Sequence, residues 1–414
     1  MKPFFNVQTV DQVHAFAKEV ATLAAEEVAL SDALGRSLAG RFKAPHDLPG
    51  FIRATMDGYA VRGRDTFGAS ETEPGYLNLV GEVMMGQTPP FKLGPGQCAR
   101  IGTGGMLPEG ADAVVMVEHT RLLDDENVEI AKSAAPGTNL LGAADDAEAG
   151  QELLPAGQCL RPQDLGLLAG LGLSRVSVVK RPRVGIISTG DEVVPVEDEP
   201  GPGQVRDVNS YTLAALITQA GGEPQAMGLV KDDEAALKAM VAESLEDNDL
   251  TLLSGGSSVG VRDLTAQVFM SFPGAEMKVH GVAVSPGKPF IWVQAEGAHL
   301  IGLPGQVASC MVAFNILVEP ILERMLGRAA LAFTRFARLP AKLMRNLPSA
   351  QGREDYIRVR VGLNGDGSWQ AEPVFGKSGL IRTLTQGHGL VRIPLENEGL
   401  DGGSQVEVLL FPRI

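Results

Sequence analysis

The residues best suited to chemistry lie in a glycine- and serine-rich loop that follows the apolar run 250–253. Its members are Gly255, Gly256, Ser257, Ser258 and Gly260. Glycines let the backbone approach a ligand closely, serines donate hydrogen bonds, and a helix start attracts anions, so the loop suits a phosphate. Asp263 follows, and a carboxylate beside a phosphate indicates Mg²⁺. The loop is neither a Walker A motif nor a dinucleotide fingerprint.

Further polar loops come directly after short apolar runs. They are residues 189–192, Pro286-Gly287-Lys288 and Pro304-Gly305. In open α/β sheets, ligands bind beyond the carboxyl ends of the strands. Glu192 and Asp263 would then share one sheet edge, where the metal or acid interpretation is favoured over helix capping. Lys288 would add a point charge near an anion, although a rigid turn with a solvated lysine explains the same residues.

Other polar residues have simpler structural explanations. Asp232-Asp233 opens a helical pattern, where an N-cap and first-turn acids account for the pair, so any role of Asp232 in function is secondary. Asp57-Gly58 is a turn signal, and the glycine-rich run 100–105 around Thr103 either binds an anion or simply turns. The six histidines show no ligand spacing, so we expect neither a zinc site nor a histidine base.

Residues 183–326 alternate short apolar runs with helical patterns. The expected strands are 184–187, 227–230, 250–253, 279–284, 290–293 and 300–303. The expected helices are 209–220, 232–245 and a last one over 307–325. The last helix carries an apolar stripe that is either core or a subunit interface. This alternation predicts a doubly wound, mainly parallel sheet.

The flanking segments have different patterns. Residues 9–38 have helical spacing of apolar residues. Residues 51–117 hold short apolar runs between Gly/Pro clusters, which is typical of β structure. Beyond 329, the alternation over 356–361 and the turn Asn364-Gly365-Asp366-Gly367 predict a small β-barrel or sandwich.

Bulk properties narrow the function classes. With 414 residues, the chain is long enough for about two to four domains. A net charge of −14 argues against nucleic-acid binding as the main role. The three cysteines are far apart, as expected for thiols in a reducing cytosol. We find no secretory pattern and no stretch that would span a bilayer, and we expect a cytoplasmic enzyme that performs Mg²⁺-assisted chemistry on a phosphorylated small molecule.

In order and spacing, several motifs resemble those of the molybdopterin molybdenumtransferases, the family that includes the C-terminal domain of gephyrin. They are Met56-Asp57-Gly58-Tyr59-Ala60-Val61, Leu107-Pro108-Glu109-Gly110-Ala111-Asp112-Ala113-Val114-Val115-Met116, Ser188-Thr189-Gly190-Asp191-Glu192, Pro286-Gly287-Lys288-Pro289-Phe290 and Gly302-Leu303-Pro304-Gly305. The resemblance extends over nearly the whole chain.

The resemblance implies a multidomain α/β plus β protein with an elongated N-terminal part. The implied domains are an N-terminal linker and helical dimerisation domain (1–46 and 137–178), an inserted β-rich domain (47–136), a molybdopterin-binding α/β domain (179–328) and a C-terminal β-barrel domain (329–414). It also implies a reaction in which adenylylated molybdopterin and molybdate give molybdenum cofactor and AMP with Mg²⁺. By this resemblance, the active site would lie between two subunits of a homodimer. A molybdopterin adenylyltransferase partner would deliver the substrate to it.

The same resemblance assigns roles to residues. Its catalytic set is Asp57, Thr103, Asp146, Glu192, Asp232 and Asp263, of which Glu192 and Asp263 would hold the metal. Its substrate-binding set is Gly255, Gly256, Ser257, Ser258, Gly260, Pro286, Gly287, Lys288, Pro304, Gly305, Arg353 and Ser378. Asp57 and Thr103 would come from the second chain, and Arg353 and Ser378 from the C-terminal domain.

Some positions depart from the family pattern. An arginine is usual near Leu141, and the position of Ser285 is often lysine, so two cations are missing. Each loss should weaken binding of an anion by roughly 1–3 kcal/mol. A diverged paralogue that binds the pterin or a protein partner without turnover is therefore the alternative. A tungstate-preferring transferase also fits, because nothing in the sequence separates the two oxyanions.

Overall fold

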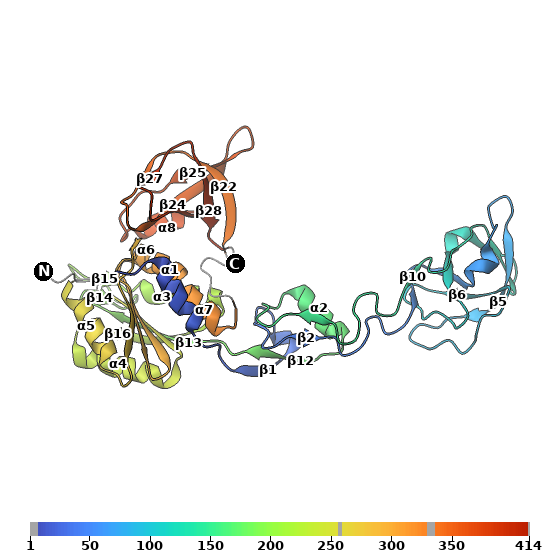
Figure 1. Cartoon of the computed structure of the whole chain (residues 1–414), viewed down its shortest axis with the longest axis horizontal. Coiled ribbons are helices and arrows are strands. Elements are labelled where there is room, and N and C mark those ends of the chain that lie inside the picture. Colours follow the sequence, from blue (N-terminus) through green and yellow to red (C-terminus); the bar gives the residue numbers. More distant parts are fainter. Residues whose placement is uncertain (1–6, 256–258, 329–335, 413–414) are drawn as a thin grey trace.

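We analysed a computed structural model of the chain, which describes residues 7–255, 259–328 and 336–412, without the side chains of 259–263. The molecule is elongated (Figure 1). An α/β sheet domain and a C-terminal barrel lie together at one end, a slender arm leads away from them, and a β-rich distal module lies at the other end. In the described ranges, every helix is too short or too polar to cross a lipid bilayer.

The sheet domain contains six strands. In order across the sheet they are β16 (Glu223–Val230), β13 (Arg183–Thr189), β17 (Leu250–Ser254), β21 (Ala298–Leu303), β20 (Ile291–Ala295) and β18 (Glu276–His280). The first four strands pair in parallel. Strand β20 pairs antiparallel with β21, and β18 pairs antiparallel with β20. The predicted mainly parallel sheet is therefore confirmed, and its two central strands are buried along their whole length.

Helices cover both faces of this sheet. They are α1 (Val10–Glu19), α3 (Asn209–Ala220), α4 (Glu234–Asp247), α5 (Val259–Met270), α6 (Val307–Ala313) and α7 (Glu319–Met325). The first two and the last two share one hydrophobic core, and α4 and α5 share the other. Local signals explain the helix ends, because Gly221 terminates α3 in the left-handed region and Asp233 caps α4.

The last helix of the sheet domain is continuous through a π-helical segment, Phe314–Val318, between α6 and α7. The sequence left open whether its apolar stripe belongs to the core or to a subunit interface. The stripe packs into the domain core, where Phe314, Leu317 and Ile321 are fully buried. This packing fixes the position of α6, whose first turn borders the candidate site.

The arm is built where two segments distant in sequence run side by side (Figure 1). Its antiparallel pairs are β1 (Ala25–Ala29) with β12 (Arg175–Val179), β2 (Phe42–Lys43) with β11 (Glu152–Leu154), and β3 (Arg53–Ala54) with β10 (Leu140–Leu141). The helix α2 (Pro162–Gly170) packs beside them. The prediction of a helix over 9–38 is wrong beyond Glu19, because pairing with β12 overrides the helical spacing.

The distal module is β-rich, as its turn signals predicted. In sheet order its strands are β7 (Ala113–Met116), β4 (Gly58–Val61), β6 (Gln97–Ile101), β5 (Gly75–Glu82), β9 (Asn127–Ile130) and β8 (Thr120–Leu122). The sheet packs hydrophobic residues on both of its faces, which gives the module two small cores of its own.

The C-terminal segment closes into a five-stranded barrel, which decides between the predicted barrel and sandwich. Its strands are β24 (Glu354–Leu363), β25 (Trp369–Pro373), β22 (Ala337–Leu343), β28 (Gln405–Leu410) and β26 (Gly389–Ile393). The short helix α8 (Ile381–Gln386) contacts α6 of the sheet domain. In addition, β19 (Val284–Ser285) of the sheet domain pairs with β24, so the two domains share a strand pairing.

Candidate active site

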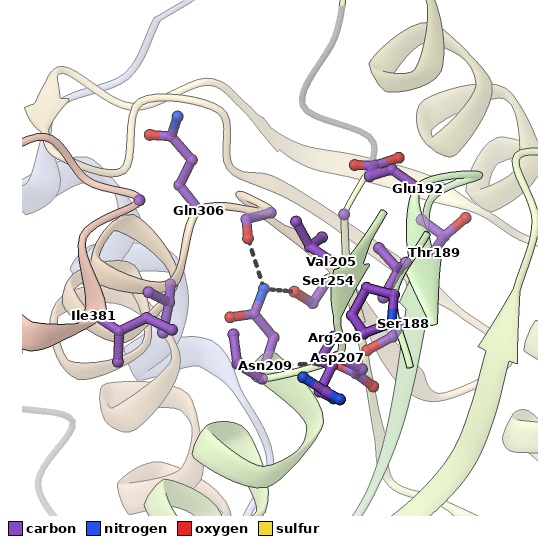
Figure 2. A pocket seen from close by; sticks show the side chains of 17 residues that line it. Ser188, Thr189, Glu192, Val205, Arg206, Asp207, Asn209, Ser254, Gln306 and Ile381 are labelled. Atoms are coloured by element: carbon purple, nitrogen blue, oxygen red, sulfur yellow. Dashed lines mark hydrogen bonds between the residues drawn. The ribbon is translucent and has the colours of Figure 1, made fainter. Parts of the chain in front are cut away.

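A cavity of about 580 Å³ lies at the carboxyl ends of β13, β17 and β21. We call it the acidic cavity, because Glu192 and Asp207 line it (Figure 2). The predicted residues Gly255 and Gly305 line it too, and Pro304 beside them is buried. The expectation that ligands bind beyond the strand ends thus coincides with an open space at that edge.

An amide side chain ties together the floor of this cavity. Asn209, at the start of α3, donates from Nδ2 to Ser254 Oγ at 2.7 Å and to the Gly305 carbonyl at 2.8 Å (Figure 2). Its side chain is almost completely buried. The residue joins three chain segments in this way and fixes the ends of β17 and β21 relative to α3.

The two acids that line the cavity differ in what already binds them. Asp207 accepts hydrogen bonds from the backbone N–H groups of Asn209 and Ser210 and from the Ser210 hydroxyl, so its carboxylate caps α3. Glu192 is exposed and follows β13 through a short turn. Within the described part of the chain, no side-chain hydrogen bond or ion pair of Glu192 is found, so this carboxylate is available to a ligand.

Asp232 lies at the same sheet edge, where β16 ends. Its Oδ1 accepts a hydrogen bond from the Thr189 hydroxyl at 2.8 Å. Partial burial raises the pKa of Asp232, the Thr189 contact opposes the shift, and the charges of Asp191 and Glu192 add to it. Asp233, and not Asp232, caps the helix. The capping explanation therefore applies to Asp233 alone.

A second cavity, of about 390 Å³, lies between the sheet domain and the barrel. We call it the basic cavity, because Lys288 and Arg353 line it. Pro286, Gly287 and Ser378 line it as well, so the structure brings together predicted binding residues from two domains. The pairing of β19 with β24 positions Lys288 and Arg353, because Lys288 follows β19 closely and Arg353 directly precedes β24.

The two cavities are neighbours across one backbone contact. The Ala308 N–H in α6 donates to the Ser378 carbonyl at 3.1 Å. Ser378 lines the basic cavity, whereas the next residue, Gly379, lines the acidic one. A ligand that spans both cavities would therefore pass over the start of α6.

The remaining predicted residues lie far from these cavities in the same chain. In the distal module, Asp57 Oδ1 accepts hydrogen bonds from the Thr103 backbone N–H and from the Thr103 hydroxyl, each at 2.7 Å. These bonds hold the pKa of the exposed Asp57 carboxyl below its usual range. Asp146 lies on the arm, where its N–H donates to the Leu48 carbonyl. One chain therefore contains two separate groups of predicted residues (Figure 1).

Part of the predicted loop falls outside the described residues, namely Gly256, Ser257 and Ser258. Gly260 and Asp263 fall within the helix α5, but the side chain of Asp263 is outside the description. In the remainder of the chain, no three His, Cys, Asp or Glu side chains come together as a metal-binding cluster.

Several residues at the cavities escaped the sequence analysis, and three of them matter most for the site. Arg206 and Asn209 line the acidic cavity, and Ser309 lines the basic one with only 7% of its surface exposed. Asn209 and Ser309 stand in helical patterns, where polar residues are usually read as surface. The one pattern that could have indicated Arg206 and Asn209 is the polar run Arg206-Asp207-Val208-Asn209, which stands at the start of a predicted helix. Helices that begin at the carboxyl ends of parallel strands place their first residues at the edge where ligands bind.

Comparison with known proteins decides the family. A molybdopterin molybdenumtransferase from a Nostoc species is 36% identical over 392 residues, which cover 94% of this chain and 89% of that protein. The chain belongs to the molybdopterin molybdenumtransferase (MoeA) family. It is a transferase of molybdenum cofactor biosynthesis.

Other matches of this MoeA-family chain agree over its whole length. Family models match as MoeA N-terminal region (domain I and II) over 8–172, probable molybdopterin binding domain over 185–324, and MoeA C-terminal region (domain IV) over 340–411. A Bacillus subtilis molybdopterin molybdenumtransferase is 32% identical, covering 98% of this chain and 93% of that one. The crystal structure of a Pyrococcus horikoshii MoeA protein superposes with a TM-score of 0.84 at 38% identity, covering 99% and 100% of the two chains.

Proposed function

We propose that this enzyme inserts molybdate into adenylylated molybdopterin and releases AMP. The observation that carries the proposal is a pair of adjacent cavities, one at the sheet edge and lined by carboxylates, the other between the sheet domain and the barrel and lined by Lys288 and Arg353. A reaction that joins an oxyanion to a phosphorylated substrate needs two such neighbouring sites. The family membership supports the same reaction.

The basic cavity would hold the oxyanion. Lys288 offers a point charge, Arg353 offers a planar fork, and the Ser309 and Ser378 hydroxyls can donate hydrogen bonds. The Arg353 Nε also contacts the Asp355 carboxylate at 3.3 Å, which orients the guanidinium without using its terminal nitrogens in that bond. Charge-assisted contacts of this kind contribute about 1.5–3 kcal/mol each.

The acidic cavity would hold the adenylyl phosphate together with Mg²⁺. Carboxylate oxygens suit this hard cation, and Glu192 with Asp263 would hold it. Because the described residues form no complete cluster, substrate oxygens and water would fill the remaining positions, as is usual for Mg²⁺. When bound, the cation would neutralise charge on the phosphate. Glu192 would orient it, and Asn209 would hold the cavity floor in place.

The active unit would be a homodimer in the cytoplasm, fed by an adenylyltransferase. Asp57 and Thr103 in the distal module, and Asp146 on the arm, lie too far from the cavities to act in their own chain (Figure 1). The elongated shape would let a second copy place its distal module over the sheet edge. Asp57 keeps Oδ2 free for a ligand, because both contacts from Thr103 use Oδ1.

The test measures AMP release from adenylylated molybdopterin with Mg²⁺, in the presence of molybdate, tungstate or neither. We expect oxyanion-stimulated release that falls at least about a hundredfold in Glu192→Gln, because the metal would lose a charged ligand. Glu372→Gln, an exposed barrel residue, is the matched control. Full activity in Glu192→Gln would refute the role of Glu192.

The non-catalytic alternative has one specific observation in its favour. Ser285, where the family often carries a lysine, lines the basic cavity, so the missing charge faces the proposed oxyanion site. If the wild type binds adenylylated molybdopterin without releasing AMP under any oxyanion, the chain is a binding paralogue. Ser285→Lys would then be the first substitution to restore turnover.

A further inference from the structure

A two-stranded ribbon borders the acidic cavity and carries residues of both charges. It consists of β14 (Val193–Val194) and β15 (Val205–Arg206), which pair in parallel. Backbone bonds from Val205 N to the Glu192 carbonyl and from Asp207 N to the Val194 carbonyl extend the pairing at both ends. The ribbon therefore holds Glu192 and Arg206 at fixed positions on the same cavity (Figure 2).

Arg206 is the only Lys or Arg among the described residues that line this cavity. Its Nε donates to the backbone carbonyls of Val196 at 2.9 Å and Asp198 at 3.1 Å. These bonds anchor the guanidinium through its inner nitrogen. The terminal nitrogens make no hydrogen bond within the described part of the chain, so the two-pronged end of the group is left for another acceptor.

The neighbouring carboxylates do not neutralise this cation. In the described ranges, no ion pair joins Arg206 to an acid, although Glu192 and Asp207 line the same cavity. Asp207 is engaged by the first turn of α3 and by the Ser210 hydroxyl. Arg206, which lines the cavity, thus carries an anchored guanidinium without an ion pair in the described ranges, whereas the acids that line the same cavity are engaged by α3 or available to a metal.

We propose that Arg206 binds the phosphate of the adenylylated substrate and so determines specificity for the nucleotide half. This assignment rests on the proposed function. A phosphate that shares the cavity with Glu192 needs positive charge from the protein as well as from a metal, and a guanidinium suits phosphate oxygens because it can bind two of them at once. The ribbon carries the residue, so recognition is built into the same element that positions Glu192.

The assignment separates the roles of the two cavities. Lys288 and Arg353 lie in the basic cavity, across the contact between α6 and the Ser378 loop. Removing them should weaken oxyanion binding, whereas removing Arg206 should weaken only ligands that carry the adenylyl phosphate.

The experiment compares binding of AMP, adenosine and adenylylated molybdopterin to the full-length wild type, Arg206→Gln, Arg206→Lys and Arg345→Gln by calorimetry. Arg345 is an exposed barrel arginine paired with Glu372, which makes it a matched control. We expect Arg206→Gln to raise the Kd for AMP and for adenylylated molybdopterin about tenfold or more, which corresponds to about 1.4 kcal/mol. Arg206→Lys should recover part of the loss, and adenosine should bind every variant equally.

Each other outcome overturns a defined statement. An unchanged Kd for AMP in Arg206→Gln, with wild-type binding intact, refutes the phosphate contact and leaves the proposed function standing. An equal loss for adenosine and AMP shows that Arg206 only supports the ribbon. If the wild type binds neither AMP nor adenylylated molybdopterin, both the proposed function and this assignment fail.

Discussion

At the scale of single residues, the partner of each carboxylate decides what it can do. Asp207 and Asp233 cap helices, so their charge stabilises the fold. Asp232 receives the Thr189 hydroxyl and has a raised pKa, whereas Asp57 receives two bonds from Thr103 and has a lowered pKa. These two acids therefore have different proton affinities, and such a contrast is typical of groups tuned for function.

Thiol labelling tests the burial of the cysteines. Cys98 and Cys310 are buried, and burial raises the pKa of each to about 12. Cys159 is exposed on the arm. We expect a thiol reagent at mildly alkaline pH to modify Cys159 rapidly and the other two only after unfolding. Cys159→Ser is the control, since it should abolish the fast phase. A second fast thiol in the native protein would contradict the buried positions.

The burial of His299 leads us to expect that the stability of the fold depends on pH. Burial, and secondarily the charge of Lys278, lowers the pKa of His299 to about 4, and the Trp292 indole N–H donates to its Nδ1 at 3.2 Å. The unfolded chain binds this proton near pH 6.5, so stability is full above that pH and is lost as pH falls towards the folded pKa. We expect a loss of about 2 kcal/mol between roughly pH 7 and pH 5.

Urea unfolding at both pH values measures this effect. His299→Gln should lose less stability on acidification than the wild type, because it removes the titrating group while keeping an acceptor for Trp292. His46→Gln, at an exposed position, should follow the wild-type curve. Parallel curves for all three proteins would contradict the lowered pKa.

Several site residues were predictable because a local pattern identifies them. Glu192, Gly255 and Gly305 follow apolar strands, and the rule that ligands bind at strand ends leads to these residues, which line the acidic cavity. Arg353 and Ser378 came only from the family resemblance, since their approach to Lys288 depends on the pairing of β19 with the barrel. Arg206 was missed because the role we propose for it depends on two backbone carbonyls that no pattern in the sequence marks.

At the scale of elements, the start of the loop after β17 constrains both the fold and the site. Gly255 has φ +138°, and a Cβ placed there would lie 2.0 Å from the Thr189 carbonyl oxygen of β13. The ends of these two strands therefore approach more closely than any side chain allows. This contact explains why glycine follows the strand, independently of any ligand.

Gly255→Ala should accordingly destabilise the sheet domain. The added methyl group must displace backbone, and we expect a loss of about 1–3 kcal/mol in the free energy of unfolding, measured by urea denaturation. Gly379→Ala is the matched control on the same cavity, because a Cβ there meets no atom within 4 Å. Equal stability of the two variants would show that the strand ends can separate without cost.

Elements were predictable where their pattern and their packing agree. The helices predicted over 209–220 and 232–245 are found as α3 and α4, because caps and buried faces coincide there. The segment after Glu19 has helical spacing, but it pairs with β12, about 150 residues away in sequence. Long-range pairing of this kind decides the arm, and a local window contains no information on it.

At the scale of the molecule, the arm separates two groups of candidate residues. The chain runs along it twice, and short antiparallel pairs along its length join the outgoing and returning segments (Figure 1). The distal module has hydrophobic cores of its own. The arm holds this module, with Asp57 and Thr103, away from the cavities of the same chain. An enzyme that uses both groups must combine two copies, and closed two-fold dimers are the commonest way to do so.

Subunit mixing tests this arrangement. Asp57→Asn and Glu192→Gln should each be inactive as homodimers, since every site would lack one group. In a mixed dimer, one site receives both substitutions and the other receives neither. Unfolding and refolding an equal mixture should restore about a quarter of the wild-type sites, because half of the dimers are mixed.

AMP release by the refolded mixture measures the recovery, and each variant refolded alone is the control. Glu192→Gln mixed with Asp232→Asn is the matched comparison, because both residues lie at the sheet edge of one chain. In that mixture, each site of a mixed dimer carries one substitution, so no activity should return. Recovery in both mixtures would indicate subunit effects other than shared sites. Recovery in neither, with dimers confirmed by light scattering, would show that Asp57 does not act across the interface.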